Sequence, residues 1–375
     1  MFNRIFRSGA GRRNNRAIGF WVAPLVMLAC MVAGAHTSAA AEARGPAVMV
    51  SKPWQPQLPN GWVLSEVSAV AVGPDDTVWV LQRPRALPEA DRAHAGPAVL
   101  AFTRDGKFLR GFGGPGDGYE WPQVEHSLAV DAKGRVWITG SFRGTSEQAD
   151  DMILVFDGQG KFVRQIGRRG KSTGNFDHAN VRTPADLFID DAHNEVYVAD
   201  GYANNRLVVF DTETGAFKRM WSAFGAAPPA ESTPSPAATD TSRDTHNDNA
   251  TPFVGVHGVE IAKDGTVYVS DRANKRIQLF TRDGHYLRQV FVNRDGAAPL
   301  SASGIAFSVD PEQRTLYVAD WGNNQVWLFD RKTLAQIGKI DASFVGPHLI
   351  ATDSTGALYV AEVQGHRVSR FVQAP

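Results

Sequence analysis

The stretch GVEIAKDGTVYVSDRANKRIQLFTRDGHYLRQVF, from Gly258 to Phe291, contains four short runs in which apolar and polar residues alternate. A period of two is typical of β-strands that bury one face. Asp-Gly pairs at 264–265 and 283–284 separate the first run from the second and the third from the fourth, and such pairs form tight hairpin turns. The stretch therefore predicts a four-stranded antiparallel sheet.

The same unit recurs along the chain. PADLFIDDAHNEVYVADGYANNRLVVFDTETGAFKRMW, from Pro184 to Trp221, is a second copy, and we count six units between about Trp62 and Phe371. One such sheet cannot bury its faces alone, but six stacked radially form a closed ring. We therefore predict an all-β fold, a six-bladed β-propeller. The last unit ends after its third strand, so we expect the segment around 48–63 to supply the outer strand and close the ring.

The start of the chain has the features of a secretory signal peptide. A basic stretch precedes an apolar run from Ala17 to Ala35, and the small residues TSAAAEA follow. Twin arginines in GRRNNR, and the sequence MLAC that ends at Cys30, leave twin-arginine export and lipidation as alternatives. We expect removal of residues 1–41, which hold the only cysteine, and a periplasmic or secreted mature domain over 42–375.

The charge balance limits the partners of the mature protein. Removing the signal peptide takes away five arginines and no acid, which leaves 34 basic and 39 acidic residues. No basic stripe remains to neutralise phosphates, so we expect no nucleic-acid partner. We also expect a monomer with no membrane contact once the signal is removed. The segment 226–250 is rich in Pro, Ser, Thr, Ala and Asp, which predicts a disordered loop within the domain.

The innermost strands of the six units share a register at their starts. Counting back five residues from the end of each innermost strand reaches the same place in every unit: Ser68, His126, Ala185, His257, Ser303 and His348. Histidine occupies every second unit. Because innermost strands line the central channel, three side chains on alternate blades are related by a pseudo-threefold axis. We therefore expect the three imidazoles to converge at one mouth of the channel.

Three converging imidazoles with an open position are the ligand set of catalytic zinc. We predict that His126, His257 and His348 bind a metal, with zinc as the expected ion. Neutral imidazole also suits copper, nickel and iron(II), so the register leaves the identity of the metal open. The alternative interpretation is a structural one, because a single histidine at a strand start often serves only to make hydrogen bonds.

The repeats VYVADGYANNRLVVFD and VYVSDRANKRIQLF resemble those of the NHL family of propellers. Together with VEHSLAVD, VHGVEIA and PHLIA, they resemble the lyase domain of peptidylglycine α-amidating monooxygenase, from about Trp62 to Phe371. This resemblance implies a six-bladed propeller with zinc on the three histidines. It also implies cleavage of a peptidyl-α-hydroxyglycine, a carbinolamide, into an amide and glyoxylate. The expected substrate is then a small molecule or the C-terminus of a peptide.

Two further site residues follow from the resemblance. Tyr202, in DGY, matches the catalytic tyrosine of the family and would accept the hydroxyl proton of the substrate. Arg83, in VLQRP, matches an arginine near the reacting centre and would hold the substrate carboxylate, with Arg85 as a rival for this role. From position alone, Tyr202 is equally a turn aromatic packed between blades, and Arg83 is a solvated loop arginine.

The sequence departs from the family beside the third histidine. Leu349 stands where the family has an aspartate tied to a structural calcium ion, and Gly346 replaces a methionine, so the resemblance leaves calcium open.

Two rival functions remain. One is a non-catalytic exported binding or scaffold module, because a fold alone does not establish activity. The other is a lactonase-like or sugar-dehydrogenase-like propeller, but we find no channel-lining set of Glu, Asn and Asp residues for it. Four acids end second strands instead, and we expect them to bind turn amides: Asp200, Asp271, Asp320 and Glu362.

Overall fold

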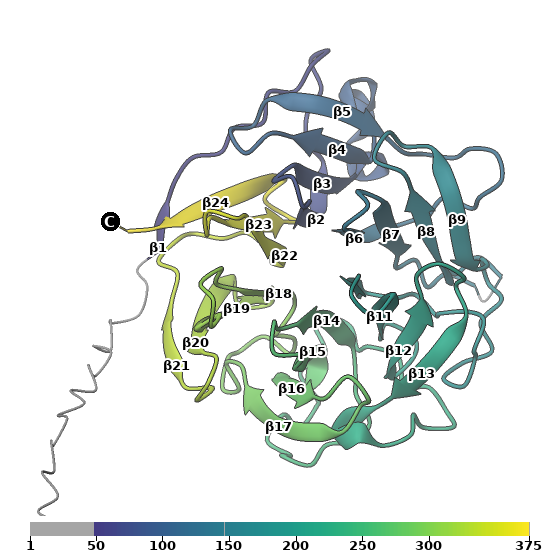
Figure 1. Ribbon diagram of the computed structural model, residues 1–375, viewed down its shortest axis with the longest axis vertical. Helices are drawn as coiled ribbons and strands as arrows, with labels where there is room; N and C mark the ends of the chain where they lie inside the picture. The colour runs from purple at the N-terminus through teal and green to yellow at the C-terminus, as the bar shows by residue number, and fades with distance from the viewer. Residues whose placement is uncertain (1–48, 146, 375) are drawn as a thin grey trace, which may run out of the picture. The chain divides into compact units, whose positions relative to one another are not determined.

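Six four-stranded antiparallel sheets surround a central channel in the computed structural model, which describes residues 49–145 and 147–374 (Figure 1). Each sheet is one blade, numbered here in the order of its innermost strand along the chain, and its strands follow one another outward from the channel. The prediction of an all-β six-bladed propeller is confirmed. The signal peptide predicted for residues 1–41 lies outside the described residues.

The strands of the first three blades are β2 Glu66–Val72, β3 Val78–Arg83, β4 Val99–Phe102 and β5 Phe108–Phe112; β6 Glu125–Val130, β7 Val136–Gly140, β8 Met152–Phe156 and β9 Phe162–Gly167; β10 Asp186–Asp190, β11 Glu195–Asp200, β12 Arg206–Asp211 and β13 Phe217–Trp221. The strands of the last three blades are β14 Val256–Ile261, β15 Val267–Asp271, β16 Arg276–Phe280 and β17 Tyr286–Phe291; β18 Ile305–Phe307, β19 Thr315–Asp320, β20 Gln325–Asp330 and β21 Gln336–Lys339; β22 Pro347–Thr352, β23 Leu358–Glu362, β24 Arg367–Gln373 and β1 Met49–Ser51. Short 3₁₀ turns are η1 Pro84–Ala86, η2 Glu89–His94, η3 Ala223–Gly225 and η4 Arg272–Asn274.

The second strands of the blades are buried along all or nearly all of their length. Strands β11 and β15 are buried along their whole length because neighbouring blades cover both faces of each sheet. A strand that is buried on both faces has apolar side chains at nearly every position, and the runs VYVA and VYVS match this pattern. At the Asp-Gly turns quoted above, Gly265 has φ +87° and Gly284 has φ +85°, a conformation that glycine adopts without strain.

Blade 6 contains both ends of the described chain. Its outermost strand is β1, which pairs antiparallel with β24 so that Met49 lies opposite Gln373 and Ser51 lies opposite Phe371. An apolar cluster also joins this blade to the first, with Tyr359 of β23 packed in the same core as Val80 of β3. Blades 6 and 1 are therefore held together by side-chain packing across the closure.

The segment 226–250, for which we predicted disorder, contains no strand or helix, but it makes defined hydrogen bonds with blades 3 and 4. Asn205 Nδ2 donates to Thr233 O at 2.7 Å, and Arg276 Nη2 donates to Ala250 O at 2.5 Å. Side chains of the propeller thus fix the path of this segment. Among the residues that the structure describes, no helix is both long and apolar enough to cross a bilayer.

Candidate metal centre

The three histidines of the predicted register meet in the channel. His126 lies in β6, His257 in β14 and His348 in β22, the innermost strands of blades 2, 4 and 6. Their ring centroids are 4.7–5.1 Å apart, and one nitrogen from each ring lies within 4.8 Å of the others. All three side chains are buried. The structure therefore brings together three imidazoles that are far apart in the sequence.

An irregularity in the strand aims each imidazole into the channel. The register of pairing with the second strand shifts at all three histidines: between Glu125 and Leu128, between Val256 and Gly258, and between Pro347 and Ile350. Such bulges bend a strand locally and re-aim a side chain. The same shift occurs between Val67 and Ala69, at the register position that Ser68 occupies in blade 1.

Backbone carbonyl groups orient two of the rings. They belong to Ser68 and Ala185, two of the small residues that alternate with histidine in the register. The distance from Nδ1 to the carbonyl oxygen is 2.6 Å in blades 2 and 6. In blade 4, Nδ1 of His257 is buried and has no hydrogen-bond partner among the described residues. An Nδ1–H that donates to a carbonyl leaves the Nε2 lone pair directed at the centre of the channel, as in metal-binding histidines.

The protonation states fit a metal ion. Burial lowers the pKa of His126 and of His257 well below the usual range, and it lowers the pKa of His348 to about 3, so the rings are neutral. The Nε2 atoms of His257 and His348 are 3.2 Å apart. Two nitrogens bound tetrahedrally to zinc are separated by roughly 3.4 Å. Lone pairs that face one another without a proton between them are stabilised by a cation.

A tyrosine oxygen completes the cluster, where the resemblance had implied it. Tyr202 Oη lies 2.8 Å from His126 Nε2 and 3.1 Å from His257 Nε2. Tyr202 belongs to the turn between β11 and β12, which passes close to the start of β14. Only glycine fits at position 201, because a Cβ there would lie 2.1 Å from the carbonyl oxygen of Val256. This close approach brings the phenol of blade 3 to the imidazole of blade 4.

Of the two arginines considered from the sequence, Arg83 faces the site and Arg85 does not. Arg83, at the end of β3, lines a cavity of about 270 Å³ next to the histidines. Its Nη1 pairs with Glu66 Oε2 at 2.9 Å, and its Nε donates to Glu125 O at 2.8 Å. Arg85 is 52% exposed, and its Nη2 binds oxygens of the segment 122–125 instead.

Two arginines of the cavity were missed from the sequence. The guanidinium carbons of Arg272 and Arg143 lie 5.3 Å and 5.8 Å from the centre of the Tyr202 ring, and both side chains line the same cavity. They follow the second strands of blades 4 and 2, as Tyr202 follows that of blade 3. The loops after these second strands thus face the site, but Arg272, Tyr202 and Arg143 stand one, two and three positions after their strands. Because the three positions differ, aligning the repeats would not have identified the arginines.

Comparisons with known proteins agree with this architecture. A family model described as "6-bladed beta-propeller" matches residues 145–223. Human NHL repeat-containing protein 3 is 27% identical over 293 residues, which cover 74% of this chain and 73% of that protein. A Caenorhabditis elegans protein named "Probable peptidyl-alpha-hydroxyglycine alpha-amidating lyase" is 23% identical over 257 residues, which cover 65% of this chain and 63% of that protein.

This chain is an NHL-repeat six-bladed β-propeller. It is a distant homologue of NHL repeat-containing protein 3 and of the peptidyl-α-hydroxyglycine α-amidating lyases. A solved structure titled "Streptogramin B lyase structure" has a TM-score of 0.51 at 12% identity, covering 87% of this chain and 98% of that one, which shows a common fold.

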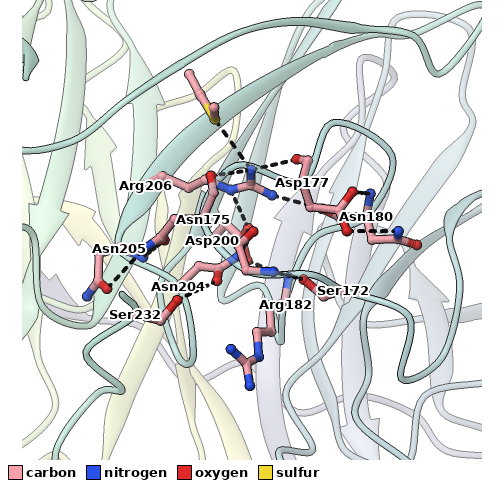
Figure 2. A network of polar contacts seen from close by, with 12 residues as sticks. Ser172, Asn175, Asp177, Asn180, Arg182, Asp200, Asn204, Asn205, Arg206 and Ser232 are labelled. Carbon is pink, nitrogen blue, oxygen red and sulfur yellow. Dashed lines mark hydrogen bonds and ion pairs between the residues drawn. The ribbon is translucent and has the colours of Figure 1, made fainter. Parts of the chain in front are cut away.

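A buried ion pair fixes the Tyr202 turn of the NHL propeller (Figure 2). Arg206 Nε donates to Asp200 Oδ2 at 2.8 Å, and both side chains are fully buried. The rest of the guanidinium donates to three carbonyl oxygens at 2.6–2.8 Å: those of Asn175, Asp177 and Asn180. The four acids that end second strands accept hydrogen bonds from backbone N–H groups, as predicted. Asp200, Asp271, Asp320 and Glu362 accept from the N–H groups of Arg182, Val254, Asn323 and Val345, respectively.

We expect Arg206→Met to lower the free energy of unfolding by about 3–5 kcal/mol, because it leaves a buried carboxylate without its charge partner and three carbonyls without donors. Urea denaturation of the two proteins measures the difference. Lys133→Met is the matched control, since Lys133 is 60% exposed in its pair with Glu213 and such pairs contribute about 0–1 kcal/mol. An equal, small effect of both substitutions would contradict the structural role of Arg206.

Two acids that the sequence analysis did not identify line the channel beyond the histidines. Asp186 of β10 and Glu260 of β14 face a channel cavity of about 410 Å³. Ser127 Oγ donates to Asp186 Oδ1 at 2.6 Å. Burial raises the pKa of Asp186 to about 7, and burial together with Asp186 raises that of Glu260 well above its usual range. Leu349 instead lies in an apolar cluster, so the position of the family's aspartate offers no calcium ligand.

The raised pKa of Asp186 predicts a pH-dependent stability. Between about pH 4 and pH 7 the folded chain holds this proton more tightly than the unfolded chain, so stability falls as the pH rises. The free energy of unfolding should fall between pH 5 and pH 8, and we expect Asp186→Asn to make this fall smaller by about 2 kcal/mol. Urea midpoints at the two pH values measure it, with exposed Asp117→Asn as the control. Parallel profiles for the parent and Asp186→Asn would contradict the prediction.

Proposed function

We propose that this NHL propeller is an exported, metal-dependent lyase that cleaves a peptidyl-α-hydroxyglycine-like carbinolamide into an amide and glyoxylate. Zinc is the proposed metal, held by His126, His257 and His348. One observation carries the proposal: three neutral imidazoles converge within 4.8 Å of one another, with Tyr202 Oη 2.8 Å and 3.1 Å from two of them. Distant homology to amidating lyases supports it.

The reaction needs a proton acceptor and an oriented substrate, and no oxidant or reductant. The hydroxyl proton of the carbinolamide leaves, the carbon–oxygen bond becomes a carbonyl, the carbon–nitrogen bond breaks and the amide nitrogen gains a proton. A bound zinc ion would supply Lewis acidity toward the substrate oxygens. Tyr202 Oη, beside the Nε2 atoms, takes the hydroxyl proton and is the group placed to return a proton to the leaving nitrogen.

The cavity charge suits an anionic substrate. Arg83, Arg143 and Arg272 all line the space beside Tyr202 and His348. Glu66 partly neutralises Arg83 at 2.9 Å, so the net charge of the lining is positive. A substrate carboxylate entering this cavity forms charge-assisted hydrogen bonds with the guanidinium groups, which orients its hydroxyl toward the Tyr202 oxygen.

The second candidate is a non-catalytic exported binding or scaffold module. Human NHL repeat-containing protein 3, at 27% identity, has a name that states the repeat and no activity, and this candidate likewise needs only the repeat fold. For either candidate we propose a periplasmic or secreted monomer without a nucleic-acid or membrane partner. For the lyase, the partner is a small molecule or a peptide C-terminus.

Glyoxylate release separates the two candidates. Purified protein is loaded with zinc and mixed with N-benzoyl-α-hydroxyglycine, and glyoxylate is measured against the spontaneous rate. Release well above that rate supports the lyase. Release at the spontaneous rate contradicts the lyase and leaves the binding module.

A further inference from the structure

The cavity beside the histidines is lined by two kinds of side chain. The guanidinium groups of Arg83, Arg143 and Arg272 line it together with Glu66, Gln364, Tyr202 and His348. We call the apolar residues of the lining its apolar side: Pro236, Ala237, Ala238, Leu300, Trp321 and Val363. A molecule that fills this space therefore meets both charged groups and hydrocarbon.

Part of the apolar side comes from the segment inserted between blades 3 and 4. We call residues 232–238 the wall segment. Thr233 and the side chain of Asn205 exchange two hydrogen bonds of 2.7 Å. Ser235, which is 3% exposed, donates its backbone N–H to the carbonyl of Tyr202 at 2.9 Å. The wall segment is thus attached to the same turn that carries the site tyrosine.

An arginine of the site also holds the wall segment. Arg143 Nη1 donates to Ser235 O at 2.8 Å while its guanidinium lies over the Tyr202 ring. The backbone of Ser235 therefore makes one hydrogen bond with Tyr202 and one with Arg143. Ser235 directly precedes the cavity-lining residues Pro236, Ala237 and Ala238. The position of this apolar surface is therefore tied to the position of the phenol.

We propose that the wall segment selects the acyl group of the substrate, and that this group is compact and apolar, such as an aromatic acyl on a carbinolamide acid. The proposal rests on the lyase function and names its substrate class. The carboxylate end lies toward the arginines, and the acyl group packs on Ala237, Ala238 and Trp321. One well-placed apolar contact of this kind discriminates about 10–200-fold between acyl groups.

Binding of two stable analogues tests the proposal without turnover. N-benzoylglycine and N-acetylglycine lack the hydroxyl and differ only in the acyl group. Isothermal titration of the zinc-loaded protein should give a Kd for N-benzoylglycine lower by about 10–200-fold. Ala238→Asp should reduce this ratio to below about threefold, because a carboxylate at the wall opposes burial of the benzoyl ring.

A matched control lies in the same inserted segment. Ala230 is exposed and does not line the cavity, so Ala230→Asp should leave the ratio of the two Kd values unchanged. A ratio below about threefold in the parent, or an equal ratio in the parent and Ala238→Asp, would overturn the proposal. Because binding is measured directly, a protein that shows the ratio but releases no glyoxylate would contradict the lyase and still support the wall segment.

Discussion

His257→Ala should lower the zinc content of the purified protein from about one ion to well below one ion per chain. Removing one of three imidazoles takes away a ligand outright, whereas even the loss of a partner that only orients a ligand costs about 10–100-fold in metal affinity. Elemental analysis after dialysis against zinc-free buffer measures the content. Metal binding also stabilises a folded chain, by about 2.7 kcal/mol when the free ion is at 100 times its Kd. This shift on adding zinc should disappear in the variant.

His246→Ala is the matched control for this experiment. His246 lies in the inserted segment, is 61% exposed and contacts Asp295, so its removal should leave the zinc content unchanged. The imidazole of His257 is fully buried among the other two. If His257→Ala keeps one zinc per chain, the three histidines are not the binding site. A thermal shift that persists in the variant leads to the same conclusion.

Tyr202→Phe should reduce the rate of glyoxylate release by about 10²–10⁴-fold while the zinc content stays near that of the parent. The substitution keeps the ring that packs beneath Arg143 and Arg272, at 5.8 Å and 5.3 Å. It removes only the oxygen that lies 2.8 Å from His126 Nε2 and 3.1 Å from His257 Nε2. The loss should therefore appear in kcat more than in KM, since phenylalanine preserves the shape of the cavity.

Tyr119→Phe is the corresponding control, because the hydroxyl of Tyr119 donates to Gly114 O at 3.0 Å in the loop between blades 1 and 2 and Tyr119 does not line the cavity. Its activity should match that of the parent. Parent-level turnover in Tyr202→Phe would exclude the phenol as the proton acceptor. A loss of zinc that accompanies the loss of activity would instead make the oxygen part of the metal site.

Only a limited part of the site could be predicted from the sequence. The common position of His126, His257 and His348 could be predicted because the repeat determines which residues begin the innermost strands and so face the channel. The pairing register of the strand shifts beside each histidine, and backbone carbonyls of the intervening blades orient two of the rings. No residue type in the sequence marks these bulges. Resemblance supplied Tyr202 and Arg83, but Arg143 and Arg272 stand at different positions after their strands, so the repeat does not mark them.

The sequence alone determined the all-β fold and the six repeats, because alternation and turn residues act over a few neighbouring positions, and it placed histidine on every second inner strand. Tertiary structure decided what surrounds those histidines: the side chains of Arg83, Arg143, Arg272 and Tyr202 at or after the ends of second strands, the acids Asp186 and Glu260 behind them, and the wall segment of residues 232–238. The physical reason is that loops from different blades converge over one channel. The residues in contact there are tens of positions apart in the sequence, so no local sequence pattern relates them.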